Sequence, residues 1–497
     1  MRCPLENHIL LQYPGVAPEI EEDFAPGIER AFSFTPQEQS YAVDQIEGDI
    51  PNFVRGTYYL NGPARFVRGR FRYRHWLDGD GMVCRLRFDT GPVHFANRFV
   101  RSEKLTVEED AGQAIFRTFG TAFQSDRLKG GIALESPVNV SVYSYNGSLL
   151  AFGEQGLPWE LDPVTLETHG KFTFGGNLND LSPFAAHPKF DRTTGEMFNF
   201  GVAFSAKQPI LNVYRFDDRG SQVYRKRLPL PFACSIHDFS LSPSYAIFYL
   251  SPYVLNMQAL ARDGCSLMDS LSWEPNRGSR LLVVARASGQ QIASIPLGRR
   301  YCLHLINSFE ADGRLNVDVV EFERPIYDQY QVPNLFTDVC NGGPVRLVVD
   351  VEGQELIDRK EMAYRLAPDF PSIDPNQATQ PYRDFWMLGI SETGRHGRKF
   401  FDQLVHVNWT QAEPHDLYHA PPMHYFGGEP IFVGDPENPT RGVVICQLFD
   451  AEHVTSAFAI FDALAVASGP KAMIRLKAPI HLGFHAYFNP EGREADS

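Results

Sequence analysis

Four histidines occur in similar local contexts along this 497-residue chain, and they constrain the fold more than any other feature. Each stands beside an aromatic or aliphatic stretch that is typical of a β-strand start, and for three of them the residues of a hairpin turn follow. Because the four are spread over more than half of the chain, only a tertiary fold could bring them together. We therefore expect one buried metal site, assembled by the fold from His187, His237, His304 and His485.

The rest of the chain favours an all-β protein. From about residue 48 onward, short segments with period-two patterning alternate with turn signals such as Asn146-Gly147 and Asp312-Gly313. The steps from residue 187 to 237 and from 237 to 304 are 50 and 67 residues, about one four-stranded propeller blade with its loops. Roughly 450 strand-rich residues at this period predict a β-propeller of about seven blades. In such a fold, residues from several blades can meet near the central axis.

Two stretches depart from this pattern. Residues 1–40 are rich in proline and acidic residues, and we expect them to form an irregular arm before a single propeller domain over residues 41–497. The apolar stretch 250–262 is expected to be helical after Pro252. It either packs across the top face of the propeller or forms an exposed apolar patch that contacts a membrane surface.

Composition excludes several classes of function. The chain has 46 basic and 60 acidic residues, a net charge of −14, and no large basic cluster, which argues against a nucleic-acid partner. Its seven cysteines are scattered without a Cys-x-x-Cys pair, as is typical of a reducing compartment. No apolar run is long enough to span a membrane and no signal peptide is apparent, so we expect a cytoplasmic protein.

Imidazole ligands suit iron, zinc, copper or nickel, and pattern alone does not separate the four histidines from His75, His94, His424 or His481. The 38 phenylalanines and 20 tyrosines indicate an aromatic core. As a population they would also suit a long apolar tunnel for a lipophilic ligand.

Several motifs resemble the carotenoid cleavage oxygenase family. Asn61-Gly62-Pro63 and residues 75–83 (HWLDGDGMV) resemble its early signature, and residues 427–433 (GGEPIFV) resemble a late strand motif. The four histidine contexts resemble the ligand motifs of the family in the same order. The resemblance extends from about residue 40 to 488 and implies a seven-bladed β-propeller with a helical and loop cap on its top face. Residues 75–81 we interpret as a structural turn.

The resemblance also implies a metal centre and a reaction. The four histidines would hold a non-haem iron(II), and Glu154, Asp369 and Glu429 would orient three of them through hydrogen bonds. Where this chain has Asp369, the family usually has glutamate, so either the backbone approaches the imidazole or a water bridges the gap. The reaction would be cleavage by O2 of a conjugated carbon–carbon double bond, giving two carbonyl products, with no acid–base pair from the side chains.

The leading hypothesis is thus an iron(II) dioxygenase that acts on a carotenoid or apocarotenoid. A second is cleavage of phenolic stilbenoids of the lignostilbene or resveratrol type, for which Tyr73 and Lys104 are candidate contacts to the phenol, although a lysine in this context is more often on the solvated surface. A metal-free propeller that binds partners and an isomerase that uses the same scaffold are further alternatives. Measuring the iron content would distinguish a metal-free binding propeller from an iron enzyme. Measuring oxygen consumption would distinguish an isomerase from a dioxygenase.

Overall fold

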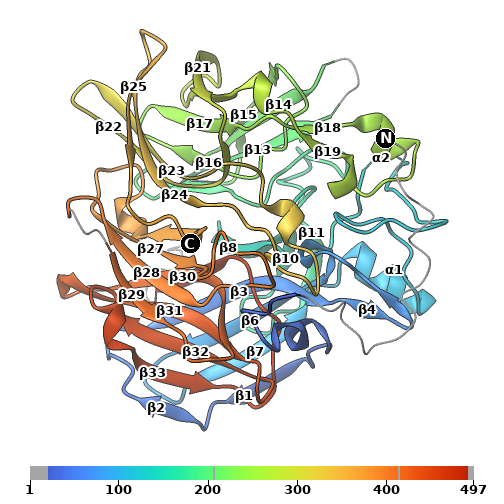
Figure 1. The fold of residues 1–497 in the computed structure, drawn as a ribbon, viewed down its shortest axis with the longest axis vertical. Helices are drawn as coiled ribbons and strands as arrows, with labels where there is room; N and C mark the ends of the chain where they lie inside the picture. Colours follow the sequence, from blue (N-terminus) through green and yellow to red (C-terminus); the bar gives the residue numbers. More distant parts are fainter. Residues whose placement is uncertain (1–20, 132, 205–207, 412–414, 491–497) are drawn as a thin grey trace.

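Seven antiparallel sheets of four or five strands form the body of the protein in the computed structural model, which describes residues 21–131, 133–204, 208–411 and 415–490. The sheets succeed one another around the molecule, so that the colours of Figure 1 run around it from blue through green to red. This arrangement confirms the predicted seven-bladed β-propeller.

In blades 2 to 7 the chain enters on the strand nearest the axis and then moves outward. Blade 2 consists of β8 (Ser141–Tyr145), β9 (Ser148–Phe152), β10 (Trp159–Leu161) and β11 (Thr168–Lys171). Blade 3 consists of β12 (Lys189–Asp191), β13 (Glu196–Ala203), β14 (Ile210–Phe216) and β15 (Gln222–Pro229). Blade 4 consists of β16 (Phe239–Leu241), β17 (Tyr245–Leu250), β20 (Ser279–Ala285) and β21 (Gln291–Gly298). Blade 5 consists of β22 (Tyr301–Ala311), β23 (Arg314–Phe322), β24 (Gly342–Asp350) and β25 (Glu355–Glu361). Blade 6 consists of β26 (Asp369–Ile373), β27 (Asp384–Gly389), β28 (Gln403–Asn408) and β29 (His415–His419). Blade 7 contains β30 (His424–Asp435), β31 (Asn438–Asp450), β32 (Thr455–Asp462) and β33 (Pro470–Arg475).

Strands from both ends of the described chain close the ring. β34 (Ala486–Pro490) pairs with β3 (Gly56–Arg65) as the innermost strand of blade 1, and β2 (Ile46–Gly48) completes blade 7 by pairing with β33. In Figure 1 the blue strands accordingly lie beside the red ones. This pairing joins the first and last blades through hydrogen bonds, so the ring does not depend on side-chain packing alone at its seam. The outer strands of blade 1 are β6 (Asp80–Phe88), β7 (His94–Phe99) and β1 (Gln39–Ala42).

Inner and outer strands differ in burial because only the inner ones are covered on both faces. The first nine residues of β22 are buried, whereas every residue of β15 at the rim of blade 3 is half-buried or exposed. The rim strand β25 (ELIDRKE) is also exposed and charged, which discourages pairing with the edge of another sheet. The long apolar inner strands therefore build the core around the axis.

Loops and short elements cover one face of the propeller. The N-cap of helix α1 (Glu103–Ala111) is Ser102, whose hydroxyl accepts a hydrogen bond from the Leu105 N–H. The N-cap of helix α2 (Met257–Ala261) is Asn256, whose side chain accepts hydrogen bonds from two backbone N–H groups. Elsewhere in the molecule, the remaining short elements outside the seven sheets are β4 (Val67–Arg68), β5 (Phe71–Arg72), β18 (Tyr253–Leu255), β19 (Leu271–Trp273) and 3-10 turns at Ile28–Phe32, Trp76–Asp78, Met268–Ser270, Pro275–Arg277, Tyr327–Gln329, Pro375–Gln377 and Val466–Ser468.

The segment 250–262 differs from its prediction. Instead of one helix after Pro252 it forms strand β18, which pairs with β19, and then the short helix α2. Leu250, Tyr253, Leu255 and Leu260 are at most 4% exposed, and Val254 and Met257 are half-buried. Of the two alternatives for this segment, packing across the cap is the one observed, because most of these side chains face the core and no large apolar patch of the described segment is exposed.

The N-terminal arm lies partly outside the described residues, which begin at residue 21. The described part packs on the propeller: Ile28 and Phe32 are buried, and Asp23 accepts a hydrogen bond of 3.1 Å from Nε of Arg398. None of the helices in the described ranges has the length and apolar character that crossing a bilayer requires.

Candidate metal centre

Each of the seven blades delivers one side chain to the same place near the axis. The four histidines stand at or close to the start of an innermost strand, and the three carboxylates come from the blades between or beside them. In order of the blades these residues are His485, Glu154, His187, His237, His304, Asp369 and Glu429. The site is thus a product of the closed ring.

The four histidines form one buried group. Their candidate ligand nitrogens all lie within 4.8 Å of one another. Nε2 of His237 lies 2.9 Å from Nε2 of His187 and 3.1 Å from Nε2 of His304. Metal–nitrogen bonds of about 2.1 Å at right angles would place two nitrogens about 3.0 Å apart. The spacing of the imidazoles therefore fits one metal ion with four nitrogen ligands.

Three of the imidazoles donate a hydrogen bond through Nδ1 to a carboxylate. The proton on Nδ1 leaves Nε2 with the lone pair that a metal requires, and the acceptor fixes the orientation of the ring. The negative charges also offset the 2+ charge that four neutral ligands leave uncompensated. The Nδ1-to-oxygen distances are 2.9 Å for His237 and Glu154, 2.5 Å for His304 and Asp369, and 3.3 Å for His485 and Glu429.

Asp369 reaches His304 directly, so of the two expected solutions the backbone approaches and no bridging water is needed. The backbone around this residue is unusual: Ala367 and Phe370 have φ angles of 44° and 53°, values that residues other than glycine rarely adopt. The second carboxylate oxygen accepts a hydrogen bond of 2.7 Å from the hydroxyl of Tyr330. Backbone and tyrosine together hold the shorter acid in place.

Burial and charge set the protonation of the ligands. Burial lowers the pKa of His187 well below its usual value, and burial also lowers the pKa of His485 although Glu429 opposes it. For His304, burial alone would lower the pKa, but the adjacent Asp369 carboxylate outweighs it and the pKa is raised. Burial would raise the pKa of Asp369, and its contact with His304 lowers it instead. Among these three histidines, His304 is therefore the one that most favours a proton when no metal is bound.

An apolar cavity adjoins the metal centre on the side of the cap. It is small, about 30 Å³, and its wall includes Glu154 together with Ile236, the residue before the ligand His237. Aromatic and aliphatic side chains such as Phe119, Phe184 and Leu255 make up most of the remainder. Such a wall suits an apolar substrate.

A larger cavity of about 1260 Å³ opens along the axis on the face away from the cap. Its wall includes Lys189, Leu305 and Ala486, which lie one or two residues beyond histidines of the site, and also Glu429. The metal centre thus lies between a small cavity under the cap and a larger axial cavity.

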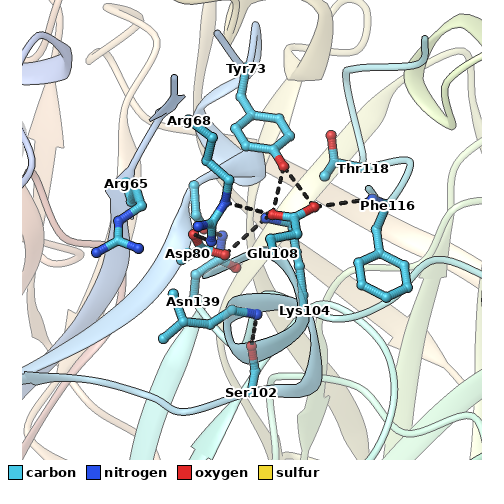
Figure 2. Close-up of polar contacts among 12 residues, drawn as sticks. Arg65, Arg68, Tyr73, Asp80, Ser102, Lys104, Glu108, Phe116, Thr118 and Asn139 are labelled. Carbon is cyan, nitrogen blue, oxygen red and sulfur yellow. Dashed lines mark hydrogen bonds and ion pairs between the residues drawn. The ribbon is translucent and has the colours of Figure 1, made fainter. Parts of the chain in front are cut away.

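Tyr73 and Lys104 lie in a closed cluster of charges (Figure 2), not on the solvated surface expected for the lysine. The ammonium of Lys104 is 0% exposed, lies 2.8 Å from Asp80 and 3.0 Å from Glu108, and stacks 4.4 Å from the ring centre of Tyr73. Tyr73 donates to Glu108, and the Arg68 guanidinium contacts both acids. Burial opposes the charge of Lys104, but the two carboxylates and Tyr73 raise its pKa. The prediction of a solvated lysine was wrong because Lys104 lies on the buried side of helix α1.

The motif at residues 75–81 makes the hydrogen bonds of a turn. The imidazole Nδ1 of His75 accepts from the Leu77 N–H, and Asp78 accepts from the His75 N–H. Asp78 also binds the N–H of Gly120 and the hydroxyl of Thr121. The motif thus positions the loop that carries Phe119 in the wall of the apolar cavity.

Sequence patterns did not point to Tyr330, which supports Asp369, or to any partner for Asp238. The aspartate directly follows a predicted ligand, and this adjacency is the one signal that could have drawn attention to it. Tyr330 carries no such signal because the contact joins a loop of blade 5 to a strand of blade 6.

Comparison with known proteins identifies relatives over nearly the whole chain. A family model described as retinal pigment epithelial membrane protein matches residues 32–490. Apocarotenoid-15,15'-oxygenase of Synechocystis sp. is 29% identical over 473 residues, which cover 92% of this chain and 94% of the relative. A cobalt-substituted structure of the Synechocystis apocarotenoid oxygenase superposes with a TM-score of 0.85 at 26% identity and covers 93% of this chain and 98% of its own.

Two further relatives carry different names. Isoeugenol monooxygenase of Pseudomonas nitroreducens is 26% identical, over 90% of this chain and 94% of the relative. Resveratrol cleavage oxygenase 1 of Chaetomium globosum is 27% identical, over 89% of this chain and 84% of the relative. Similarity of this level is shared among oxygenases whose names refer to different substrates.

Proposed function

The chain belongs to the retinal pigment epithelial membrane protein family, which includes the carotenoid cleavage oxygenases, and from this premise we propose that it is an iron(II)-dependent dioxygenase of apocarotenoids or carotenoids. It cleaves one conjugated carbon–carbon double bond with O2 and releases two carbonyl products. The observation that carries this proposal is the set of four converging imidazoles, three of them held by carboxylates at 2.5 to 3.3 Å.

Iron(II) bound by His187, His237, His304 and His485 would supply coordination positions that remain open for oxygen chemistry, since four nitrogens leave part of an octahedron free. The residues around the metal position its ligands and the substrate. Glu154, Asp369 and Glu429 hold three ligands in one tautomer. The apolar side chains beside Glu154 and Ile236 suit an alkene, and because the cavity is only about 30 Å³, its lining side chains would have to move to admit a conjugated chain. The depth to which the chain then enters would select the bond.

Two observations favour an apocarotenoid as the substrate. The cavity beside Glu154 and Ile236 is lined mainly by Phe119, Phe184 and other apolar side chains, which suit a conjugated hydrocarbon chain. Among the relatives described above, the Synechocystis apocarotenoid oxygenase also has the highest identity. Both observations support a lipophilic alkene as the substrate.

Cleavage of a phenolic stilbenoid is the second candidate, favoured by the similarity to a resveratrol cleavage oxygenase. Its proposed contacts, Tyr73 and Lys104, are less suited to this role than the sequence indicated. The lysine is paired with Asp80 and Glu108, and the tyrosine hydroxyl is bonded to Glu108. A phenol would have to displace one of these partners from a buried cluster.

Product analysis separates the two candidates. Protein loaded with iron(II) is incubated in air with one apocarotenal and one hydroxystilbene, and aldehyde products and oxygen uptake are measured together. The proposal predicts cleavage of the apocarotenal with oxygen consumption, and the product lengths identify the bond. Cleavage of the hydroxystilbene alone would move the assignment to phenolic substrates, and isomerisation without oxygen uptake would contradict a dioxygenase.

A further inference from the structure

We propose that Asp238 is a positioning residue of the metal centre, a fourth carboxylate that acts on the strands carrying the histidines and not on an imidazole. The inference rests on the proposed metal site and goes beyond its three histidine-bound carboxylates. Asp238 directly follows the ligand His237 and is 3% exposed. Its carboxylate lies 3.9 Å from Nδ1 of His187, which is beyond hydrogen-bond distance.

The Asp238 carboxylate instead contacts residues next to two other ligands. Oδ1 lies 2.8 Å from the ammonium of Lys189, two residues after His187. Oδ2 accepts a hydrogen bond of 2.9 Å from the N–H of Leu305, the residue after His304. One side chain thus joins the strands that carry three of the four ligands.

These contacts matter because the strands belong to different sheets. β12, β16 and β22 are the innermost strands of blades 3, 4 and 5, and no β-ladder of the described chain runs between them. Their relative position depends on side chains that cross the blade boundary. A shift of a few tenths of an ångström between blades would move a nitrogen ligand, and metal sites need their ligands held closely. Asp238 is placed to prevent that shift.

Both oxygens of Asp238 are needed as acceptors. Oδ1 receives the Lys189 ammonium and also the N–H of Phe239 at 2.8 Å, while Oδ2 receives the Leu305 N–H. Burial would raise the pKa of Asp238, but Lys189 and the hydrogen bonds lower it, so the group is held as an anion. An asparagine would turn an NH₂ group toward one of these donors, and one of the two blade contacts would be lost.

The test is the affinity and geometry of bound Co²⁺ in the whole protein carrying Asp238→Asn. We expect the Kd for Co²⁺, measured by competition with a chromophoric chelator, to rise about 10- to 100-fold, as is typical when an outer partner of a metal site is removed. The visible d–d spectrum of the cobalt protein should also change, because the relative position of the ligands changes.

Asp318→Asn is the matched control. Asp318 is also fully buried and paired with an arginine, Arg346, at 2.7 Å from each oxygen, but within blade 5 and away from the histidines. This variant should lower the melting temperature and leave the cobalt Kd and spectrum as in the wild type. An Asp238→Asn protein that behaves in the same way would overturn the proposal.

Lys189→Met keeps the proposal testable if Asp238→Asn does not fold. The Lys189 side chain is 30% exposed, so its loss is tolerated more easily, and it breaks the contact between blades 3 and 4. The cobalt spectrum of this variant should differ from that of the wild type; an identical spectrum contradicts the inference. If the wild type itself binds neither cobalt nor iron, the proposed metal centre fails and not merely the role of Asp238.

Discussion

Nδ1 of His304 and Oδ1 of Asp369 are 2.5 Å apart, the shortest of the three imidazole–carboxylate contacts at the metal centre. The acid that makes this contact is one methylene shorter than the glutamate of the family resemblance. The contact is reached because the backbone on both sides takes left-handed angles and because Tyr330 binds the other oxygen. The position is therefore built around an aspartate.

Asp369→Glu should weaken metal binding, since the added methylene has to displace either the His304 ring or the Tyr330 hydroxyl. We expect the Kd for iron(II) or Co²⁺ to rise by roughly 10-fold. Tyr330→Phe is the milder variant, because it removes one hydrogen bond worth about 1 kcal/mol and leaves the carboxylate in place. Metal titration of both variants checks this. A glutamate variant that binds metal as tightly as the wild type would show that the site accommodates either acid.

Metal affinity should increase with pH. In the metal-free protein the carboxylate of Asp369 outweighs burial and raises the pKa of His304, whereas burial lowers the pKa values of His187 and His485. Below the pKa of His304 the metal must displace its proton, so binding is weaker; above this pKa the imidazole is neutral and binding reaches its full strength.

Isothermal titration of Co²⁺ between about pH 6 and about pH 8 measures this effect. Proton release on binding should fall as the pH rises through the pKa of His304. In Asp369→Asn the raised pKa is lost, so the increase in affinity should move to lower pH. An affinity that does not change over this range in the wild type would contradict the assignment of the proton to His304.

Lys104→Met should unfold the protein at lower denaturant concentration, because it leaves the buried carboxylates of Asp80 and Glu108 with less positive charge. Removing one partner from a buried ion pair costs about 3–5 kcal/mol. Lys171 is a matched control, since it also contacts two acids, Glu103 and Asp180, but at the surface. Lys171→Met should cost less than about 1 kcal/mol.

Tyr73→Phe examines whether the same cluster contacts a phenolic substrate. A structural role predicts a loss of about 1 kcal/mol in the free energy of unfolding and an unchanged KM for any substrate that the enzyme cleaves. A large increase in KM for a hydroxystilbene alone, at unchanged stability, would instead indicate that Tyr73 binds the phenol.

Local patterns predicted the parts of this protein that depend on strand periodicity. The alternation of strands and turns indicated the propeller, and the similar contexts of the histidines placed each near the start of an inner strand, where the fold brings all four together. Glu154, Asp369 and Glu429 were expected from the family resemblance, and each lies within hydrogen-bond distance of a histidine.

What the sequence could not predict depends on packing between distant segments. The burial of Lys104 follows from the position of helix α1 over β6, and the burial of segment 250–262 follows from the pairing of β18 with a strand that begins at Leu271. The contacts of Tyr330 and Asp238 cross blade boundaries. A pattern within ten residues carries no information about which residue of another blade lies opposite.

The most direct test of the central claim is the iron content of the protein after anaerobic loading with iron(II), measured together with aldehyde formation in air. The wild type should hold about one iron per chain and cleave its substrate, and His237→Ala should lose both. His481→Ala is the matched control: His481 is also a buried histidine, burial lowers its pKa to about 3, and it lies outside the group of four. This control should keep iron and activity. Absence of iron from the wild type, or a folded His237→Ala protein that retains both iron and cleavage, would contradict the account.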